Sequence, residues 1–216
     1  MRAGSERSIS RSTASLIPRS YRNGFVYSIK TLYRSSLDPD TFQQLIREVK
    51  IQSFLNHPSI VKLYHFFVDE ESAYLVLEPC LGKNLYQNLK ENGKMAEKVV
   101  KEYIRQVCTA VEYMHKNDII HRDLKPENIL LHEVSLCLSQ NSIKICDFGW
   151  AVHSPMLRAT QCGTPVYTSP EIVKKLPYDS KIDIWSIGIL TYELLYGTIP
   201  FEIRHIDDLA KIVRFV

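Results

Sequence analysis

The stretch IIHRDLKPENILL, residues 119–131, places a dense group of polar side chains between two apolar runs. Its ionisable and amide groups belong to His121, Arg122, Asp123, Lys125, Glu127 and Asn128. A buried segment would leave such groups without partners at a cost in free energy, and a solvated loop needs no apolar flanks. We therefore predict a loop that rigid structure holds on both sides and whose side chains face a ligand.

The composition of the chain narrows the classes of protein to which it can belong. With 216 residues, 45% of them hydrophobic, it can bury a core as one large domain or as two lobes. A net charge of +3 is too small to argue for nucleic-acid binding. Five scattered cysteines without metal-ligand spacing favour reduced thiols in the cytosol or nucleus. No apolar run reaches membrane-spanning length.

Residues 1–22 differ from the rest of the chain because they are rich in serine and arginine, with Glu6 as their only acid. This composition predicts a disordered arm. Ser8 and Ser12 each follow an arginine and are candidates for phosphorylation. An organelle transit peptide has a similar composition and is the alternative for this segment.

The first part of the remaining chain is rich in strand signals. The β-branched and aromatic run 25–32 predicts a strand, and 62–78 predicts two strands joined by an acidic turn. Between them, the apolar residues of 41–55 recur at helical spacing.

Helix signals dominate the second part of the chain. Residues 100–114 carry a regular amphipathic stripe, and 182–197 is so apolar that we expect a helix buried on all sides. A short strand is predicted at 142–146. Strands first and helices afterwards indicate an α+β protein with a small β-rich lobe and a larger helical lobe.

HRDLKPEN (121–128) followed by DFG (147–149) is a specific combination, and it resembles the eukaryotic protein kinase family from about residue 23 to the end of the chain. Within that family the sequence is most similar to the Aurora kinases. The similar stretches are REVKIQS (47–53), DFGWAVHSP (147–155), CGTP (162–165) and KIDIWSIGILTYELLYG (181–197). The resemblance implies a two-lobed kinase fold, with a partial small lobe at 23–79 and a partial large lobe at 80–216.

The resemblance implies transfer of the γ-phosphate of ATP to serine or threonine, with Mg²⁺ as the metal. Asp147 and Asn128 would hold the metal through oxygen atoms. Asp123 would orient the substrate hydroxyl, and Lys125 would neutralise charge on the moving phosphate. Lysine at this position resembles the Ser/Thr branch of the family.

In the small lobe, the resemblance implies that Lys30 contacts the ATP phosphates and pairs with Glu48. An edge-strand surface lysine and a solvated helix glutamate are the ordinary alternatives for these two residues.

The resemblance also implies a binding site for the adenine base. Leu77 would border the base, Glu78, Pro79 and Cys80 would form the hinge whose backbone binds it, and Gly82 would end the hinge.

Thr160 lies between DFG and SPE and is the predicted regulatory phosphosite, with Arg122 as the partner of its phosphate. Arg158 precedes it by two residues, as in substrates of basophilic kinases, and Glu127 would receive that arginine. Thr164 belongs to the predicted substrate-recognition segment. An unmodified loop threonine is the alternative for Thr160.

The sequence departs from the family pattern at both ends. Gly4 and Gly24 are the only glycines before Gly82, so the glycine-rich loop and first strand are expected to be missing, with at most a remnant near Leu16-Ile17. The chain stops at Val216, before the last helices of the family. Glu171 would then lack its arginine partner. A truncated gene model or a splice form would explain both gaps.

Two functions from different classes follow. The first is an Aurora-like Ser/Thr kinase that acts in mitosis on proteins with arginine upstream of the target residue. It would be a monomer in the nucleus and cytoplasm, at the spindle, centrosome or centromere, with activator proteins docked on its small lobe and no nucleic acid or membrane as partner. The second is a catalytically impaired kinase-fold binding module. A small-molecule kinase is disfavoured by CGTPVYTSPE (162–171), which is typical of a peptide-docking loop.

Overall fold

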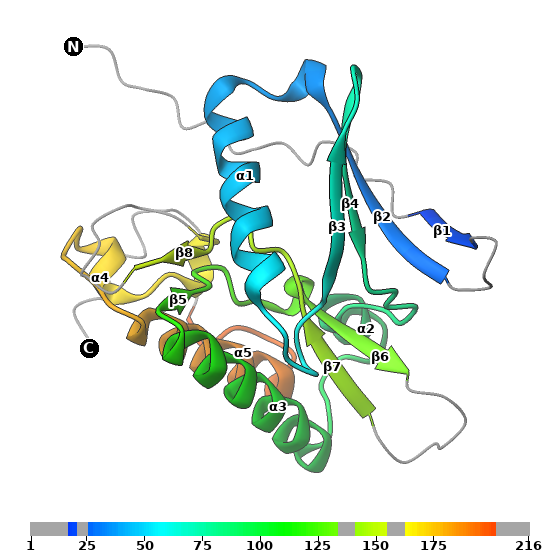
Figure 1. Cartoon of the computed structure of the whole chain (residues 1–216). Coiled ribbons are helices and arrows are strands. Elements are labelled where there is room, and N and C mark those ends of the chain that lie inside the picture. The colour runs from blue at the N-terminus through cyan, green and yellow to red at the C-terminus, as the bar shows by residue number, and fades with distance from the viewer. Residues whose placement is uncertain (1–16, 21–25, 134–140, 155–162, 202–216) are drawn as a thin grey trace.

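The computed structural model describes residues 17–20, 26–133, 141–154 and 163–201 of the chain. These residues form two lobes, an upper one built on a sheet and a lower one built mainly of helices (Figure 1). The α+β class and the order of strands before helices that the sequence predicts are therefore confirmed.

The small lobe is an antiparallel sheet against which one long helix packs. Its strands lie in the order β1-β2-β4-β3, with the bounds Ile17–Ser20, Val26–Tyr33, Ser72–Leu77 and Leu63–Val68. The short helix η1, Arg34–Ser36, leads from β2 to helix α1, Pro39–Phe54. The core between sheet and helix contains Leu32, Leu45, Leu63, Ala73 and Leu75.

Local chemistry explains where α1 begins. The Asp38 side chain accepts a hydrogen bond from the Thr41 amide at 2.8 Å, and Pro39 occupies the first turn, where its missing N–H costs nothing. The range 41–55 that periodicity predicts begins two residues after the first residue of α1 and ends one residue after its last. Leu45 and Glu48 lie on its buried face.

The expected disordered arm needs a correction at its end. Ile17–Ser20 form β1, which pairs antiparallel with β2 so that Ile17 lies opposite Ile29 and Ser20 opposite Val26. The composition of residues 1–22 does not predict this strand. Its backbone groups form hydrogen bonds with the edge of β2, and side-chain composition carries no information about such pairing. The strand lies where the sequence suggested at most a remnant near Leu16-Ile17.

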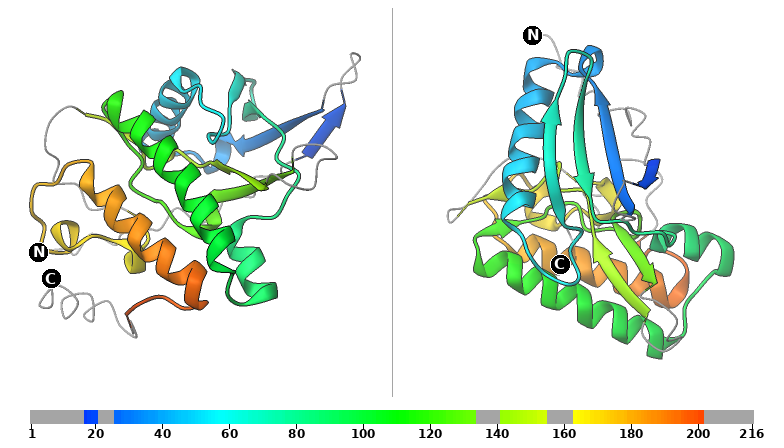
Figure 2. Two further views of the ribbon diagram at one scale, coloured as in Figure 1. Left: turned by 90° about the horizontal axis from the view of Figure 1, so that it is seen from below. Right: turned by 45° about the vertical axis from the view of Figure 1, so that its right-hand side comes forward.

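The large lobe is built around two long helices, α3 (Glu97–Lys116) and α5 (Lys181–Tyr196), which lie side by side in Figure 2. Its shorter helices are α2 (Leu85–Asn92), η2 (Pro126–Asn128), η3 (Pro165–Tyr167) and α4 (Pro170–Val173). Two antiparallel strand pairs complete it, β5 (Ile119–Ile120) with β8 (Val152–His153), and β6 (Ile129–Glu133) with β7 (Asn141–Ile145).

The predicted stripe of α3 is buried as expected. Val100, Val107, Val111 and Met114 are at most 2% exposed, and their side chains belong to the main core of the large lobe. The helix thereby buries one apolar face and leaves its charged face to solvent.

Helix α5 is not buried on all sides, so that expectation was wrong. Leu190 and Leu194 are fully buried, but Ile184, Tyr192 and Tyr196 are 55%, 39% and 62% exposed. Among the described elements, α3 and η3 pack on one side of the helix and leave the other side uncovered. No helix in the described ranges is both long and apolar enough to cross a membrane.

Candidate active site

The loop between β5 and β6 is held from beneath by a carboxylate of α5. Asp183 has no solvent exposure, and it accepts hydrogen bonds from the backbone amides of His121 at 3.0 Å and Arg122 at 2.9 Å. His115 Nε2 on α3 lies 2.8 Å from the same carboxylate. The loop is therefore rigidly attached to the two central helices, as its apolar flanks predicted.

Sequence reasoning missed Asp183. A signal was present, because an aspartate in an otherwise apolar helix that is expected to be buried must find partners or pay a large desolvation cost. That signal predicts a paired carboxylate, but it does not say which backbone groups form the pair.

Asp123 is the centre of a compact polar cluster and is only 4% exposed. Its Oδ2 lies 2.6 Å from Lys125 Nζ and 3.0 Å from Asn128 Nδ2, which both donate to it. Its Oδ1 accepts hydrogen bonds from the Thr164 amide at 3.1 Å and the Thr164 hydroxyl at 2.8 Å. Lys125 also donates to the Thr164 hydroxyl at 2.7 Å. The loop thus brings together four of the residues singled out in the sequence.

Asn128 directly precedes the first strand of the β6–β7 hairpin, and Asp147 follows the second strand, so both lie at the open end of the hairpin. In the β6–β7 pair, Ile129 lies opposite Ile145, and the Cys146 amide donates to the Asn128 carbonyl at 2.9 Å. The strand pairing therefore places the residue before β6 close to the residues after β7. The two motifs converge although the sequence separates them by almost twenty positions.

The backbone is unusual at both motifs. Arg122 and Asp147 have positive φ angles of 69° and 64°, in a region that residues other than glycine seldom adopt. Such conformations cost free energy, persist only where surrounding structure enforces them, and concentrate at functional sites. Next to these residues, His121 and Phe148 are fully buried with ring centroids 5.1 Å apart, so both rings pack in the interior.

The small lobe adds a buried ion pair to this site. Lys30 Nζ on β2 lies 2.8 Å from Glu48 Oε1 on α1. Burial by itself would lower the pKa of Lys30, but the charges of Glu48 and Asp147 outweigh it and raise the pKa to about 12. The pairing of Lys30 with Glu48 is therefore present, and the Asp147 carboxylate is close enough to act on the same ammonium group.

The predicted hinge follows β4 and leads into α2. Leu77, Glu78 and Cys80 are all partly buried. Burial and the charge of Glu78 raise the pKa of the Cys80 thiol to about 11, so the thiol is neutral at physiological pH. A Cβ on Gly82 would lie 2.1 Å from the Leu131 carbonyl oxygen, so only glycine lets the hinge pass this close to β6.

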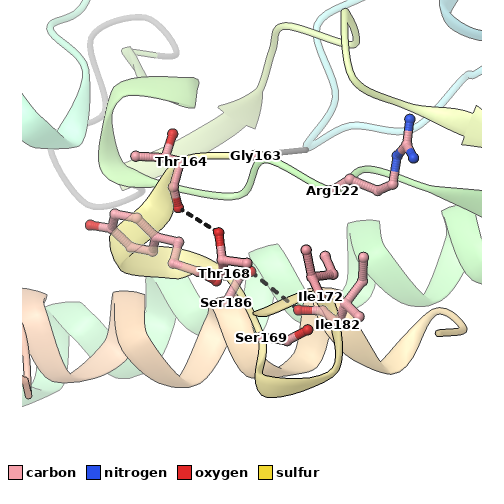
Figure 3. A pocket seen from close by; sticks show the side chains of 9 residues that line it. Arg122, Gly163, Thr164, Thr168, Ser169, Ile172, Ile182 and Ser186 are labelled. Atoms are coloured by element: carbon pink, nitrogen blue, oxygen red, sulfur yellow. Dashed lines mark hydrogen bonds between the residues drawn. The ribbon is translucent and has the colours of Figure 1, made fainter. Parts of the chain in front are cut away.

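The segment that begins at Gly163 lies directly on the loop between β5 and β6. Gly163 has a φ of 93°, and a Cβ there would meet the Arg122 carbonyl oxygen at 2.7 Å. Figure 3 shows Thr164 and Thr168 beyond it, around a small cavity of about 10 Å³. The Thr168 hydroxyl donates to the Thr164 carbonyl at 3.1 Å, and Ser186 donates to the Tyr167 carbonyl at 3.1 Å. These bonds position the Thr164 side chain against Asp123.

Arg122 points away from this cavity in Figure 3. Its guanidinium donates to the Trp150 carbonyl at 2.7 Å and to the Tyr178 hydroxyl at 2.8 Å. Thr160, its predicted phosphate partner, and Arg158 lie outside the described residues. Glu171 is exposed to solvent, so the cost expected for an unpaired buried carboxylate does not arise there.

The connection between β5 and β6 carries a second carboxylate besides Asp123, that of Glu127. Glu127 Oε2 is buried without a hydrogen-bond partner in the described part of the structure, and Glu193 on α5 accepts a hydrogen bond from the Tyr167 hydroxyl. Burial and the charge of Glu127 raise the pKa of Glu193, although the bond from Tyr167 lowers it. Glu193 was not identified from the sequence, because a single glutamate late in an apolar helix carries no distinctive spacing.

Asn128 and Asp147, which flank the β6–β7 hairpin, carry side-chain oxygen atoms of the kind that Mg²⁺ binds. The Asn128 Nδ2 donates to both the backbone and the carboxylate of Asp123, which leaves its side-chain oxygen as the atom for a metal, and the Asp147 carboxylate is exposed. In the residues that the structure covers, no group of three or more acidic, histidine or cysteine side chains is arranged to hold a metal ion. This is compatible with Mg²⁺, which commonly takes one or two protein oxygens and completes its shell with phosphates and water.

Replacing Asp183 by asparagine should destabilise the chain. The amides of His121 and Arg122 donate to different oxygens of Asp183, so an amide NH₂ would face one of these two donors and leave it without an acceptor. We therefore expect the free energy of unfolding to fall by about 3 kcal/mol. Urea denaturation measures it. Asp179→Asn is the matched control, because Asp179 is exposed and bonds only the Lys181 amide, at 2.8 Å. Equal losses in the two variants would contradict the assigned role of Asp183.

Replacing Glu48 by glutamine should lower the pKa of Lys30 from about 12. Because that pKa is above the ordinary value of 10.5, the pair stabilises the folded chain at neutral pH and its contribution is lost only as pH rises through about 12. An NMR titration of the lysine Nζ measures the change. Glu91→Gln, which removes the exposed pair with Lys83, should leave the Lys30 titration unchanged. An unaltered Lys30 titration in Glu48→Gln would contradict the pairing.

Comparison with known proteins agrees with this geometry. The sequence model described as "Protein kinase domain" matches residues 15–215. The chain is 41% identical over 200 residues to Serine/threonine-protein kinase Aurora-1 of Arabidopsis thaliana, covering 92% of this chain and 66% of that protein. It is 44% identical over 183 residues to an Aurora kinase of Schizosaccharomyces pombe, covering 84% and 50%.

A mammalian relative gives the same result. Aurora kinase C of Mus musculus is 40% identical over 202 residues, covering 93% of this chain and 71% of that protein. The chain thus spans from half to somewhat over two thirds of the length of these relatives, and slightly under two thirds of the Arabidopsis one. The matched residues include the whole of the site described above. The chain belongs to the protein kinase domain family, and the relatives it resembles are Aurora-type serine/threonine kinases.

Proposed function

We propose that the chain is the catalytic part of an Aurora-like serine/threonine protein kinase, which transfers the γ-phosphate of ATP to hydroxyl groups of proteins. The observation that carries this proposal is the cluster around Asp123. A buried carboxylate, an ammonium group and a side-chain amide converge there next to the hairpin that brings Asp147 toward Lys30. This set of groups suits phosphoryl transfer, which depends on positioning and charge neutralisation more than on covalent chemistry.

In the proposed reaction, the substrate oxygen forms a bond to the γ-phosphorus while the bond from that phosphorus to the β-phosphate oxygen breaks. Asp123 orients the hydroxyl and accepts its proton. Lys125 neutralises charge on the group in transfer, and Lys30, held by Glu48, contacts the α- and β-phosphates. Asn128 and Asp147 would hold Mg²⁺, which neutralises phosphate charge when it is bound.

Leu77, Glu78, Cys80 and Gly82 would line the site of the adenine base in this proposal. Backbone groups of the hinge would bind the edge of the base. The close approach of Gly82 to Leu131 supports this, because it fixes the path of the hinge against β6.

Binding of nucleotide without turnover is the second candidate function. Gly4 and Gly24 are the only glycines that precede Gly82 in this sequence, so the residues given before Lys30 contain no glycine-rich loop to cover the phosphates and exclude water. Phosphate transfer to a protein substrate distinguishes the two functions, since both include nucleotide binding.

MgATP should raise the melting temperature of the chain, and Asp147→Ala should abolish this shift because the metal loses its charged ligand. Asp123→Asn should keep the shift but lower the rate of phosphate transfer by about a hundredfold or more. Thermal shift and radiolabelled phosphate transfer are the measurements. Asp179→Asn, at an exposed aspartate remote from these contacts, is the control. No shift in the unsubstituted chain would contradict nucleotide binding, and a shift without transfer would favour the binding module.

We further propose that the substrate carries arginine upstream of the target residue. Glu127 and Glu193 supply two carboxylates, one with a buried oxygen that has no protein partner in the described structure. A guanidinium group can satisfy such an oxygen with charge-assisted hydrogen bonds in a fixed geometry. Thr164, bonded to both Asp123 and Lys125, would hold the substrate-docking segment against the catalytic loop.

Glu127→Gln should lower kcat/KM by about tenfold for a peptide with upstream arginine, because one charged acceptor is lost. The same substitution should change kcat/KM little for a peptide with alanine in place of that arginine. Glu112→Gln, at an exposed helix position paired with Lys116, is the control. A loss of equal size for both peptides would show that Glu127 does not select arginine.

Regulation and partners follow the same proposal. Phosphorylated Thr160 would bind Arg122, which Trp150 and Tyr178 hold in place.

An activator protein would dock on the small lobe. The protein would act in mitosis as a monomer in the nucleus and cytoplasm, at the spindle, centrosome or centromere. A groove of about 750 Å³ between α1 of the small lobe and the β5–β8 region of the large lobe, lined by Arg47, Phe54 and His153 among others, is a place where such an activator protein could contact the small lobe.

A further inference from the structure

A second buried ion pair joins the lobes on the side of the hinge. Lys144 on β7 is only 6% exposed. Its Nζ lies 2.9 Å from Glu78 Oε1 and donates to the Pro58 carbonyl at 2.7 Å. Glu78 is the first hinge residue after β4, and Lys144 precedes Asp147 by three residues. The pair therefore links the place proposed for the base to the strand that leads to the proposed metal ligand.

The carboxylate of Glu78 is held from two directions. Its Oε2 accepts a hydrogen bond from the Lys62 amide at 3.2 Å, and the Glu78 amide donates to the Lys62 carbonyl at 2.9 Å. Lys144 therefore attaches to a carboxylate that is already fixed to the start of β3. A shift of β7 relative to the hinge would break this ion pair.

The backbone around Lys144 is tied to the small lobe as well. The Ile145 amide donates to the Ser59 carbonyl at 2.9 Å, and the Val61 amide donates to the Ile145 carbonyl at 2.9 Å. Figure 1 shows β7 beneath the lower ends of β3 and β4. These bonds hold β7 against the segment before β3, but none of them reaches the hinge. Among the bonds that β7 makes within the described residues, only the one from the Lys144 side chain reaches the hinge.

Glu78 is the group that balances the charge of Lys144. Burial and, after it, the Lys144 charge lower the pKa of His57 and His132, so these neighbouring rings are neutral at physiological pH. Cys80 is also neutral there, because burial and the charge of Glu78 raise its pKa. The ammonium group is thus surrounded by neutral groups and paired with one carboxylate.

Stability alone gives a weak reason for this pair. Burying an ammonium group and a carboxylate costs desolvation free energy that their attraction often fails to exceed, and apolar residues of similar size are frequently as stabilising. A buried pair does, however, hold two segments in one relative position, since any other position leaves an unpaired charge.

We propose that Lys144 is a positioning residue for nucleotide binding, which acts through Glu78 to hold the hinge in the position that receives the adenine base. The inference rests on the proposed function. It predicts that loss of the Lys144 charge impairs recognition of the base itself, because Glu78 at the start of the hinge then loses its ion pair with β7, while the bond from the Leu131 amide to the Lys83 carbonyl holds only the far end of the hinge.

The experiment measures the affinity of the whole chain for adenosine, which has no phosphates and so does not depend on Lys30 or Asp147. Lys144→Met removes the charge and keeps an unbranched side chain that is one heavy atom shorter. We expect adenosine to bind about tenfold more weakly to this variant, since small misplacements of positioning groups have large effects. Lys83→Met, which removes an exposed ion pair with Glu91, is the matched control and should bind adenosine like the unsubstituted chain.

A double-mutant cycle with Glu78→Gln tests the route of the effect. If Lys144 acts through Glu78, Glu78→Gln should weaken adenosine binding similarly and the double variant should lose little more. Glu78→Gln also tests the inference if Lys144→Met does not fold, because the Glu78 side chain is 20% exposed. Affinities are measured well below each variant's melting temperature, so that a merely structural role changes the melting temperature alone.

The outcomes separate the inference from the function on which it rests. An unsubstituted chain that binds neither adenosine nor MgATP overturns both. A chain that binds adenosine equally well with Lys144→Met and with Lys83→Met overturns the inference and leaves the proposed function intact. Additive losses in the double-mutant cycle also overturn it, because they would show that Lys144 does not act through Glu78.

Discussion

The geometry of the site depends on one buried carboxylate, Asp183, which accepts hydrogen bonds from the backbone of the catalytic loop. A fully buried carboxylate must be satisfied, and here the amides of His121 and Arg122 satisfy it together with His115. This requirement forces the loop to run close to α5. Within the loop so placed, the side chains of Asp123, Lys125 and Asn128 bond one another.

The constraint has a second effect on the backbone. Arg122 adopts a positive φ, and so does Asp147 at the end of the neighbouring hairpin. Conformations of this kind are unfavourable in isolation and are maintained by the bonds around them. The site is therefore arranged before any ligand arrives, which is what electrostatic stabilisation of a reacting group requires, because the groups need not reorganise during the reaction.

Two ion pairs lie at this site, and they differ in kind. Lys30 and Glu48 both belong to the small lobe, and the charge of Asp147 reaches them from the other lobe. Lys144 and Glu78 join β7 directly to the hinge. The first pair prepares an ammonium group for a negatively charged ligand. The second sets the relative position of two segments that would contact different ends of one nucleotide.

The sequence by itself determined the class of the fold, the three longest helices, the main strands of the small lobe, and the residues of the Asp123 cluster, because periodicity and local motifs depend on neighbours in the chain. Only the tertiary structure decided the roles of Asp183, Glu193 and Lys144, whose partners are distant in sequence and include backbone groups. It also showed that β1 forms and that α5 is exposed on one side. Pairing at a sheet edge and coverage of a helix depend on what lies alongside in space, which composition and periodicity do not record.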